Sequence, residues 1–123
     1  QADIGIKEDR FAAVVQYERG EPVFRIEGNT EIRGDGLYAV PGFIDSHVHI
    51  ESTMVTPNMF ASTILRFGTT VAVIDPHEIA NVLGVKGVRE IVEASQGLPV
   101  RILITIPPCV PAVPGLETAG RCC

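Results

Sequence analysis

Two histidines with one residue between them, His47 and His49, form the strongest chemical feature of the sequence. Side chains two positions apart on a β-strand point to the same side, so both imidazoles can reach one metal ion while Val48 packs on the opposite face. Neutral imidazole is a common ligand of divalent transition metals. The alternative is a hydrogen-bonded pair without a metal. The position of the pair directly after Gly-Phe-Ile-Asp-Ser, residues 42–46, favours the metal site.

Two further residues are candidates for a role beside this pair. Asp45 precedes His47 by two positions, and its carboxylate could either orient a ligating imidazole or accept hydrogen bonds from nearby backbone donors. His77 follows a second apolar segment, between Asp75 and Glu78, which we interpret as helix-capping residues. No cap requires a histidine, so His77 is a candidate for contacting substrate or metal.

The elements that would position these residues begin with a buried strand, expected within residues 43–50. A helix should follow, because Thr56 is a favourable N-cap and Pro57 suits the first helical position. Gly68 is placed to end this helix in a left-handed conformation. The expected apolar face of the helix consists of Phe60, Ile64 and Phe67.

The apolar run of residues 71–74 predicts a second strand, buried on both faces as in parallel sheets. We expect the next helix to start with Asp75 as N-cap, Pro76 as its first residue and Glu78 in the capping-box position. Gly84 and Gly87 should interrupt the helical pattern, and a third strand is expected over residues 100–106. The apolar stripes of the two helical parts are Ile79, Val82, Leu83, Val88, Ile91 and Val92.

Residues 1–40 instead show short β-type segments separated by polar turns and no helical period. Four strands are expected, within residues 4–7, 11–15, 23–26 and 37–40. The chain thus reads as an α/β protein in which a small β-unit precedes a β-α-β-α-β series.

Alternating strands and helices favour a parallel sheet with right-handed crossovers. Open doubly wound sheets and (β/α)8 barrels of the TIM type both begin in this way. The sequence contains neither Gly-x-Gly-x-x-Gly nor Gly-x-x-x-x-Gly-Lys-Ser/Thr, the usual signatures of nucleotide-binding open sheets. In a barrel, His47 and His49 would lie at the carboxyl end of a strand, where barrel enzymes place their catalytic groups.

Composition excludes several classes of protein. The 123 residues are 46% hydrophobic and carry a formal net charge of −5 without a cluster of Lys or Arg, which argues against nucleic-acid binding. No apolar run approaches the roughly 18 residues of a membrane span, and charged residues interrupt the start of the chain where a signal peptide would be apolar. Three cysteines do not form a disulfide framework. We therefore expect a cytoplasmic protein with neither nucleic acid nor membrane as partner.

Residues 40–49, Val-Pro-Gly-Phe-Ile-Asp-Ser-His-Val-His, resemble the amidohydrolase superfamily. Four later blocks resemble the adenine deaminases within it, and the block from Asp75 to Gly84 is the most specific, since amidohydrolases in general lack it. The other three blocks are Ile50 to Met54, Phe67 to Thr70 and Pro108 to Ala112.

This resemblance implies that residues 1–40 form part of an N-terminal β-sandwich and that residues 41–123 form the first units of a metal-dependent (β/α)8 barrel. It implies that His47 and His49 bind a divalent metal centre, usually binuclear, with manganese or iron. It also implies that metal-activated water hydrolyses adenine to hypoxanthine and ammonia, so the expected partner is a small purine. Whether the protein forms a homo-oligomer is left open.

A complete barrel usually needs about 250 residues, so we expect this chain to be an incomplete, N-terminal piece. The catalytic aspartate, the bridging carboxylate and the further histidines of the family are expected beyond residue 123, and the chain alone is expected to be inactive. Two alternatives remain: an amidohydrolase that acts on another cyclic amidine or amide, and a non-catalytic α/β fragment.

Overall fold

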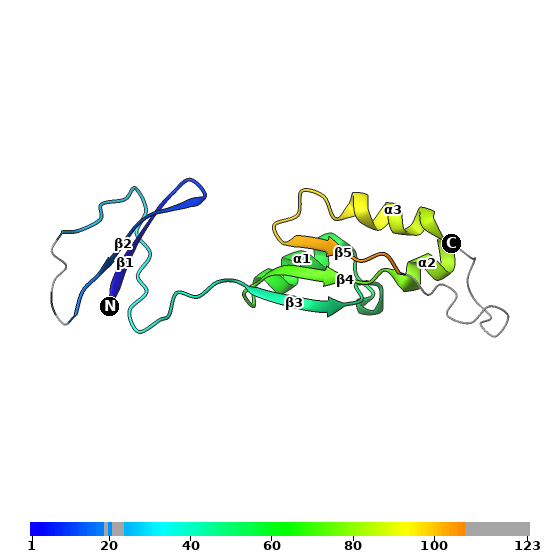
Figure 1. The fold of residues 1–123 in the computed structure, drawn as a ribbon, viewed down its shortest axis with the longest axis horizontal. Coiled ribbons are helices and arrows are strands. Elements are labelled where there is room, and N and C mark those ends of the chain that lie inside the picture. The colour runs from blue at the N-terminus through cyan, green and yellow to red at the C-terminus, as the bar shows by residue number, and fades with distance from the viewer. Residues whose placement is uncertain (19, 21–23, 108–123) are drawn as a thin grey trace. The chain divides into compact units, whose positions relative to one another are not determined.

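The computed structural model describes residues 1–18, 20 and 24–107 and divides the chain into two units, Gln1–Ala39 and Val40–Cys123 (Figure 1). Strands β1 (Ala2–Lys7) and β2 (Arg10–Gln16) belong to the first unit. The second unit contains strands β3 (Phe43–Val48), β4 (Thr69–Ile74) and β5 (Arg101–Ile104). Its helices are the 3-10 helix η1 (Glu51–Thr53), α1 (Pro57–Leu65), α2 (His77–Leu83) and α3 (Val85–Ala94).

The first unit is built on an antiparallel hairpin of β1 and β2. Ile26 packs on it at Gly5, where a Cβ atom would lie 3.1 Å from Ile26 Cγ2. The strands expected within residues 4–7 and 11–15 are confirmed. The prediction of a strand at residues 37–40 is wrong, because these residues form none. In the strand predicted at 23–26, residues 24–26 are not in a strand, and Val23 lies outside the described residues. Apolar β-type residues form a strand only where a partner strand is available, and Leu37 and Tyr38 are exposed instead.

The second unit contains a parallel sheet with the strand order β3-β4-β5. Each strand is connected to the next through helices, α1 after β3 and α2 with α3 after β4. The expected series β-α-β-α-β is therefore confirmed, although β5 covers only residues 101–104 of the expected 100–106.

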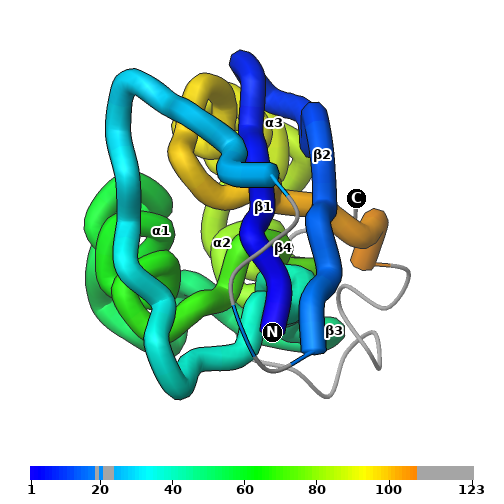
Figure 2. The backbone as a smooth tube through the Cα atoms, turned by 90° about the vertical axis from the view of Figure 1, so that its left-hand side faces the viewer, coloured from blue at the N-terminus to red at the C-terminus, as the bar shows by residue number. Residues whose placement is uncertain are grey.

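The core of this unit lies between the sheet and its connecting helices. Ala72 and Ile74 of β4 are fully buried against Ile50 and Phe60, and Ile64 of α1 and Ile91 of α3 border the same cluster. Helices α1 and α3 contact each other, and Figure 2 shows both on one side of the strands. Right-handed crossovers between strands added in one direction place successive helices on the same face.

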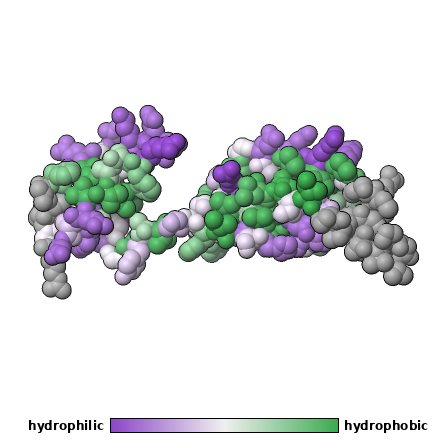
Figure 3. Space-filling model, in the orientation of Figure 1, coloured by the Kyte–Doolittle hydropathy of each residue, from purple (hydrophilic) through white to green (hydrophobic). Residues whose placement is uncertain are grey.

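The opposite face of the sheet is not covered by any helix of the described residues. Ile44 and Leu103, which pair with Val71 and Val73 of β4, lie on this face and are 66% and 41% exposed. The space-filling view shows the apolar surface that gathers over the strands in this orientation (Figure 3). The strand β4 is thus buried mainly on its helix side, and Val71 and Val73 on its other side are half-buried.

Local sequence signals explain where α1 begins and ends. The side chain of Thr56 accepts a hydrogen bond from the N–H of Met59, at 3.4 Å, and Pro57 is the first helical residue, as expected. Gly68 has a φ of +89°, the left-handed conformation that was predicted. The helix ends at Leu65, however, so Phe67 is 77% exposed, and its expected place on the apolar helix face is wrong.

The expected start of α2 is also wrong. The N-cap residue is Pro76 and makes no side-chain hydrogen bond, and His77 is the first helical residue. Asp75 does not cap the helix because its carboxylate Oδ2 lies 3.3 Å from His77 Nδ1. The N–H of Ile79, in the first turn, donates instead to Oε1 of Glu51 at 3.3 Å.

The interruption between α2 and α3 occurs at Gly84, as expected, whereas Gly87 lies inside α3. A Cβ atom on Gly87 would lie 2.8 Å from both Cγ1 and the carbonyl oxygen of Ile79, so the two helices approach closely there. Val82 and Leu83, expected in an apolar stripe, are 66% and 48% exposed. Among the residues that the structure describes, no helix combines the length and the apolar character that crossing a bilayer requires.

Candidate metal centre

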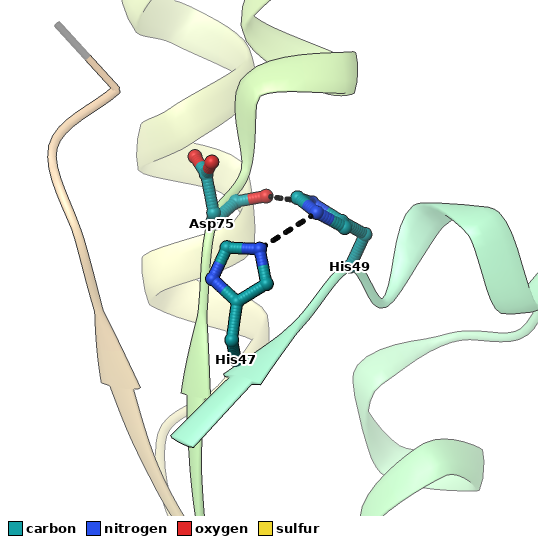
Figure 4. A group of neighbouring side chains, drawn as sticks. All are labelled: His47, His49 and Asp75. Atoms are coloured by element: carbon teal, nitrogen blue, oxygen red, sulfur yellow. Dashed lines mark hydrogen bonds between the residues drawn. The ribbon is translucent and has the colours of Figure 1, made fainter. Parts of the chain in front are cut away.

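His47 and His49 lie at the carboxyl end of β3, and their imidazole rings converge (Figure 4). Their Nε2 atoms are 3.1 Å apart, and the rings meet edge to face with centroids 4.8 Å apart. Val48 between them packs against the core, as alternation along a strand requires. The structure therefore brings together the two histidines that the sequence analysis selected.

The ring of His49 is oriented by a backbone acceptor. Its Nδ1 lies 2.9 Å from the carbonyl oxygen of Asp75, the residue directly after the neighbouring strand β4. A carbonyl oxygen only accepts hydrogen bonds, so Nδ1 carries the proton and Nε2 of the neutral ring keeps a lone pair. That lone pair is directed at His47, which supplies the proton of the hydrogen bond between the two Nε2 atoms.

Asp75 joins the site through its side chain as well. His47, His49 and Asp75 each offer one ligand atom, and these atoms lie within 4.8 Å of one another. Asp75 Oδ2 contacts His77 Nδ1, whereas Oδ1 is buried and has no hydrogen-bond partner among the described residues. Asp75 was predicted to cap a helix from its place before Pro76, so its role beside the histidines was missed. The available signal was its position, since carboxyl ends of neighbouring parallel strands meet at one edge of a sheet.

A second group overlaps the first. His49, His77 and Glu78 also offer ligand atoms within 4.8 Å of one another, and the ring of His77 lies edge to face on that of His49, with centroids 4.6 Å apart. Because Nδ1 of His49 donates to a carbonyl, only its Nε2 lone pair can bind a metal ion, and the two groups of ligand atoms share it. His77 thus lies beside the histidine pair, at the start of α2.

Of the two roles considered for Asp45, the structure shows the acceptance of a backbone hydrogen bond. The Oδ1 atom of Asp45 accepts a hydrogen bond from the backbone N–H of His47, at 3.2 Å. Between Asp45 and Val48, β3 advances three residues while β4 advances two, from Ala72 to Ile74. This irregularity interrupts the alternation that would place Asp45 and His47 on one face.

The donor geometry fits a metal ion. In a tetrahedral site with metal–nitrogen bonds of about 2.0–2.1 Å, two nitrogen ligands lie about 3.3 Å apart. The separation of 3.1 Å between the Nε2 atoms is close to that value. The hydrogen bond from His49 Nδ1 to a carbonyl is typical of ligating histidines, whose second nitrogen is held by a protein acceptor. The buried, unpaired Oδ1 of Asp75 adds a carboxylate oxygen without a partner in the described part of the chain.

The fold and this site define the class of protein. A parallel α/β sheet carries a convergent histidine pair at the carboxyl end of its first strand, and the family model described as the amidohydrolase family matches residues 38–122. The chain belongs to the amidohydrolase family.

The proteins to which the chain is similar are more specific. It is 48% identical over 119 residues to an adenine deaminase of Moorella thermoacetica, covering 96% of this chain. It is 55% identical over 109 residues to adenine deaminase 2 of Carboxydothermus hydrogenoformans, covering 89% of this chain. An adenine deaminase of Staphylothermus marinus is 57% identical over 93 residues, or 73% of this chain.

These alignments cover 19%, 19% and 15% of the three relatives. The chain therefore spans about a fifth of the length of the curated relatives it matches. Its segment of similarity includes the histidine pair and the Asp75–Gly84 block.

Proposed function

We propose that the protein containing this chain is an adenine deaminase that hydrolyses adenine to hypoxanthine and ammonia. Curated proteins of that name share between 43% and 57% of aligned residues with this chain. The single structural observation that supports the proposal is the paired Nε2 atoms of His47 and His49, with Asp75 beside them.

In this proposal, His47 and His49 hold a divalent ion, manganese or iron in a binuclear centre. Imidazole and carboxylate donors suit such metals. A bound divalent ion lowers the pKa of water and so supplies a hydroxide nucleophile at neutral pH. His49 is kept in the ligating tautomer by the Asp75 carbonyl, and the Asp75 carboxylate and His77 border the pair, where they can bind or orient further groups.

We also propose that residues 41–123 begin a (β/α)8 barrel and that residues 1–40 belong to a β-sandwich. The strand order β3-β4-β5 without reversal supports a barrel, as do the two helices on one face and the donors at the carboxyl edge. The apolar face opposite the helices would then become the interior of the barrel. Purine metabolism in the cytoplasm is the setting that a soluble purine substrate favours.

The experiment uses the full-length protein, loaded with manganese, and measures ammonia release from adenine and from a panel of other aminopurines and cyclic amides. We expect adenine to be the fastest substrate. His47→Ala and His49→Ala should each lower both the bound manganese and the activity, by at least about tenfold, whereas Glu93→Ala on the exposed side of α3 should change neither. Faster turnover of another compound would assign a different amidohydrolase activity. A protein that takes up no manganese and turns over none of the compounds would support a non-catalytic module.

A further inference from the structure

Two side-chain contacts connect the turn after β3 to the start of α2. Glu51 of η1 accepts the hydrogen bond of the Ile79 N–H through Oε1, at 3.3 Å. The hydroxyl of Ser52, the next residue, donates to Oε1 of Glu78. Both contacts span a gap of more than 25 positions in the sequence and join the same two elements.

Glu51 also replaces the cap that α2 lacks. The N-cap residue Pro76 offers no side-chain acceptor, so the first turn of α2 would otherwise leave its N–H groups without side-chain partners. A carboxylate near a helix N-terminus is also favoured by the helix dipole. The other oxygen of Glu51, Oε2, is buried and has no hydrogen-bond partner among the described residues.

The start of α2 carries the residue that packs on the metal-binding pair. His77 is the first residue of α2, two positions before Ile79, and its ring lies edge to face on His49. It also contacts Asp75 Oδ2, while the carbonyl of Asp75 holds His49 Nδ1. A shift of the first turn of α2 would therefore displace the groups that hold the ring of His49.

We propose that Glu51 is a positioning residue for the metal centre: it fixes the first turn of α2, so that His77 and Asp75 hold His49 in its ligating orientation. This inference rests on the metal site of the proposed function, and on the adenine deaminase activity for its kinetic readout only. In this role, Glu51 acts through the length and the acceptor oxygen of its side chain.

Two conservative variants of the full-length protein separate this role from a direct one. Glu51→Gln keeps the length and an acceptor oxygen but loses the charge, and Glu51→Asp keeps the charge but is one methylene shorter. We expect Glu51→Asp to weaken manganese affinity, measured by titration of the metal-free protein, by about tenfold, the lower range for residues that support metal ligands. Its kcat/KM for adenine should fall similarly, while Glu51→Gln should stay close to the unmodified protein. Glu93→Gln is the matched control on an exposed part of α3.

A double-mutant cycle tests the route through His77. In a His77→Ala background, Glu51→Asp should cause little additional loss of manganese affinity, because residues that act in one chain of contacts are not additive. Full additivity would overturn the proposal, as would a loss in Glu51→Gln with normal binding in Glu51→Asp, which would indicate that the charge acts directly. Lowered thermal stability with unchanged manganese affinity and kinetics would also overturn it, since Glu51 would then be purely structural.

The manganese titration keeps this proposal distinct from the proposed function. If the unmodified protein binds manganese but releases no ammonia from adenine, the proposed function fails, and the contrast between Glu51→Asp and Glu51→Gln in metal affinity still decides the role of Glu51.

Discussion

The phenol of Tyr17 donates a hydrogen bond of 3.1 Å to the carboxylate of Asp3, and this bond is the main reason why the pKa of Tyr17 is raised. A raised pKa means that folding favours the protonated phenol. Its contribution to stability is therefore fully present below the pKa of the unfolded chain, near 10, and is lost as the pH rises through the folded pKa.

Asp3→Asn should lower the pKa of Tyr17 towards its ordinary value, because it removes both the anionic acceptor and the negative charge. The measurement is an ultraviolet titration of tyrosinate formation on the 123-residue polypeptide, carried out in a Tyr38→Phe background so that Tyr17 is the tyrosine observed. Glu8→Gln, in the turn of the same hairpin, is the control and should leave the titration unchanged. An unaltered Tyr17 titration in Asp3→Asn would contradict the assigned cause.

At the candidate metal site, the sequence predicts the contacts between residues that are close together in the chain. His47 and His49 converge because alternation along one strand brings them to one side, and two residues of spacing suffice to foresee it. The contribution of Asp75 depends on β3 and β4 lying side by side, a long-range pairing that periodicity does not encode. The position of Asp75 also matches the pattern of a helix cap, so the local sequence predicted capping, whereas the tertiary structure places its carboxylate beside the histidines.

At the scale of elements, the approach of β3 to β4 depends on a glycine. A Cβ atom on Gly42 would lie 2.3 Å from the side chain of Thr70, on the strand that pairs with β3. The N–H of Phe43 donates to the carbonyl of Gly68, at 2.8 Å, so this end of β3 cannot move away without losing a hydrogen bond.

We expect Gly42→Ala to lower the free energy of unfolding by about 1–3 kcal/mol, the usual cost of overpacking a close contact. Gly34→Ala is the matched control, because nothing lies within 4 Å of a Cβ atom at Gly34 and its φ is not positive. Denaturant unfolding of the full-length protein measures both variants. Equal stabilities for the two variants would show that the strands can separate at Gly42 at no cost.

The element order was predictable from sequence because strands and helices of this unit differ in period and are separated by Gly and Pro signals. The predictions that failed concern the ends of the helices. Phe67 continues the helical spacing, but the chain turns into Gly68 before it can reach the core. The start of α2 was misassigned because its capping acceptor, Glu51, comes from a distant element rather than from the preceding residues.

At the scale of the whole molecule, the sheet of the second unit has an apolar face without a helix from the described residues. Ile44 and Leu103 contribute to it, and surfaces of this kind promote association when they are exposed to water. Composition predicted enough apolar material for a core, but not which apolar side chains would be left uncovered, since burial depends on how the elements pack rather than on their composition.

We therefore expect the 123-residue polypeptide on its own to self-associate and to bind a hydrophobic dye. Light scattering after size-exclusion chromatography measures the association. Ile44→Ser combined with Leu103→Ser should reduce it, whereas exposed polar positions on α3, such as Glu90→Ser, should not. A monomer that stays monodisperse across concentrations would show that this face is covered in solution.

The acceptor for His49 Nδ1 has a consequence for how the site can vary in evolution. Because the acceptor is the backbone carbonyl of Asp75, no single change of side chain deletes it. Replacing Asp75 alters the local charge and the contact with His77 but leaves the carbonyl in place. The tautomer of His49 is thus set by the pairing of β3 and β4. It should tolerate side-chain substitutions that would disable a histidine oriented by a carboxylate. Alanine scanning would overlook it, and only a change that moves the strand itself would reveal it.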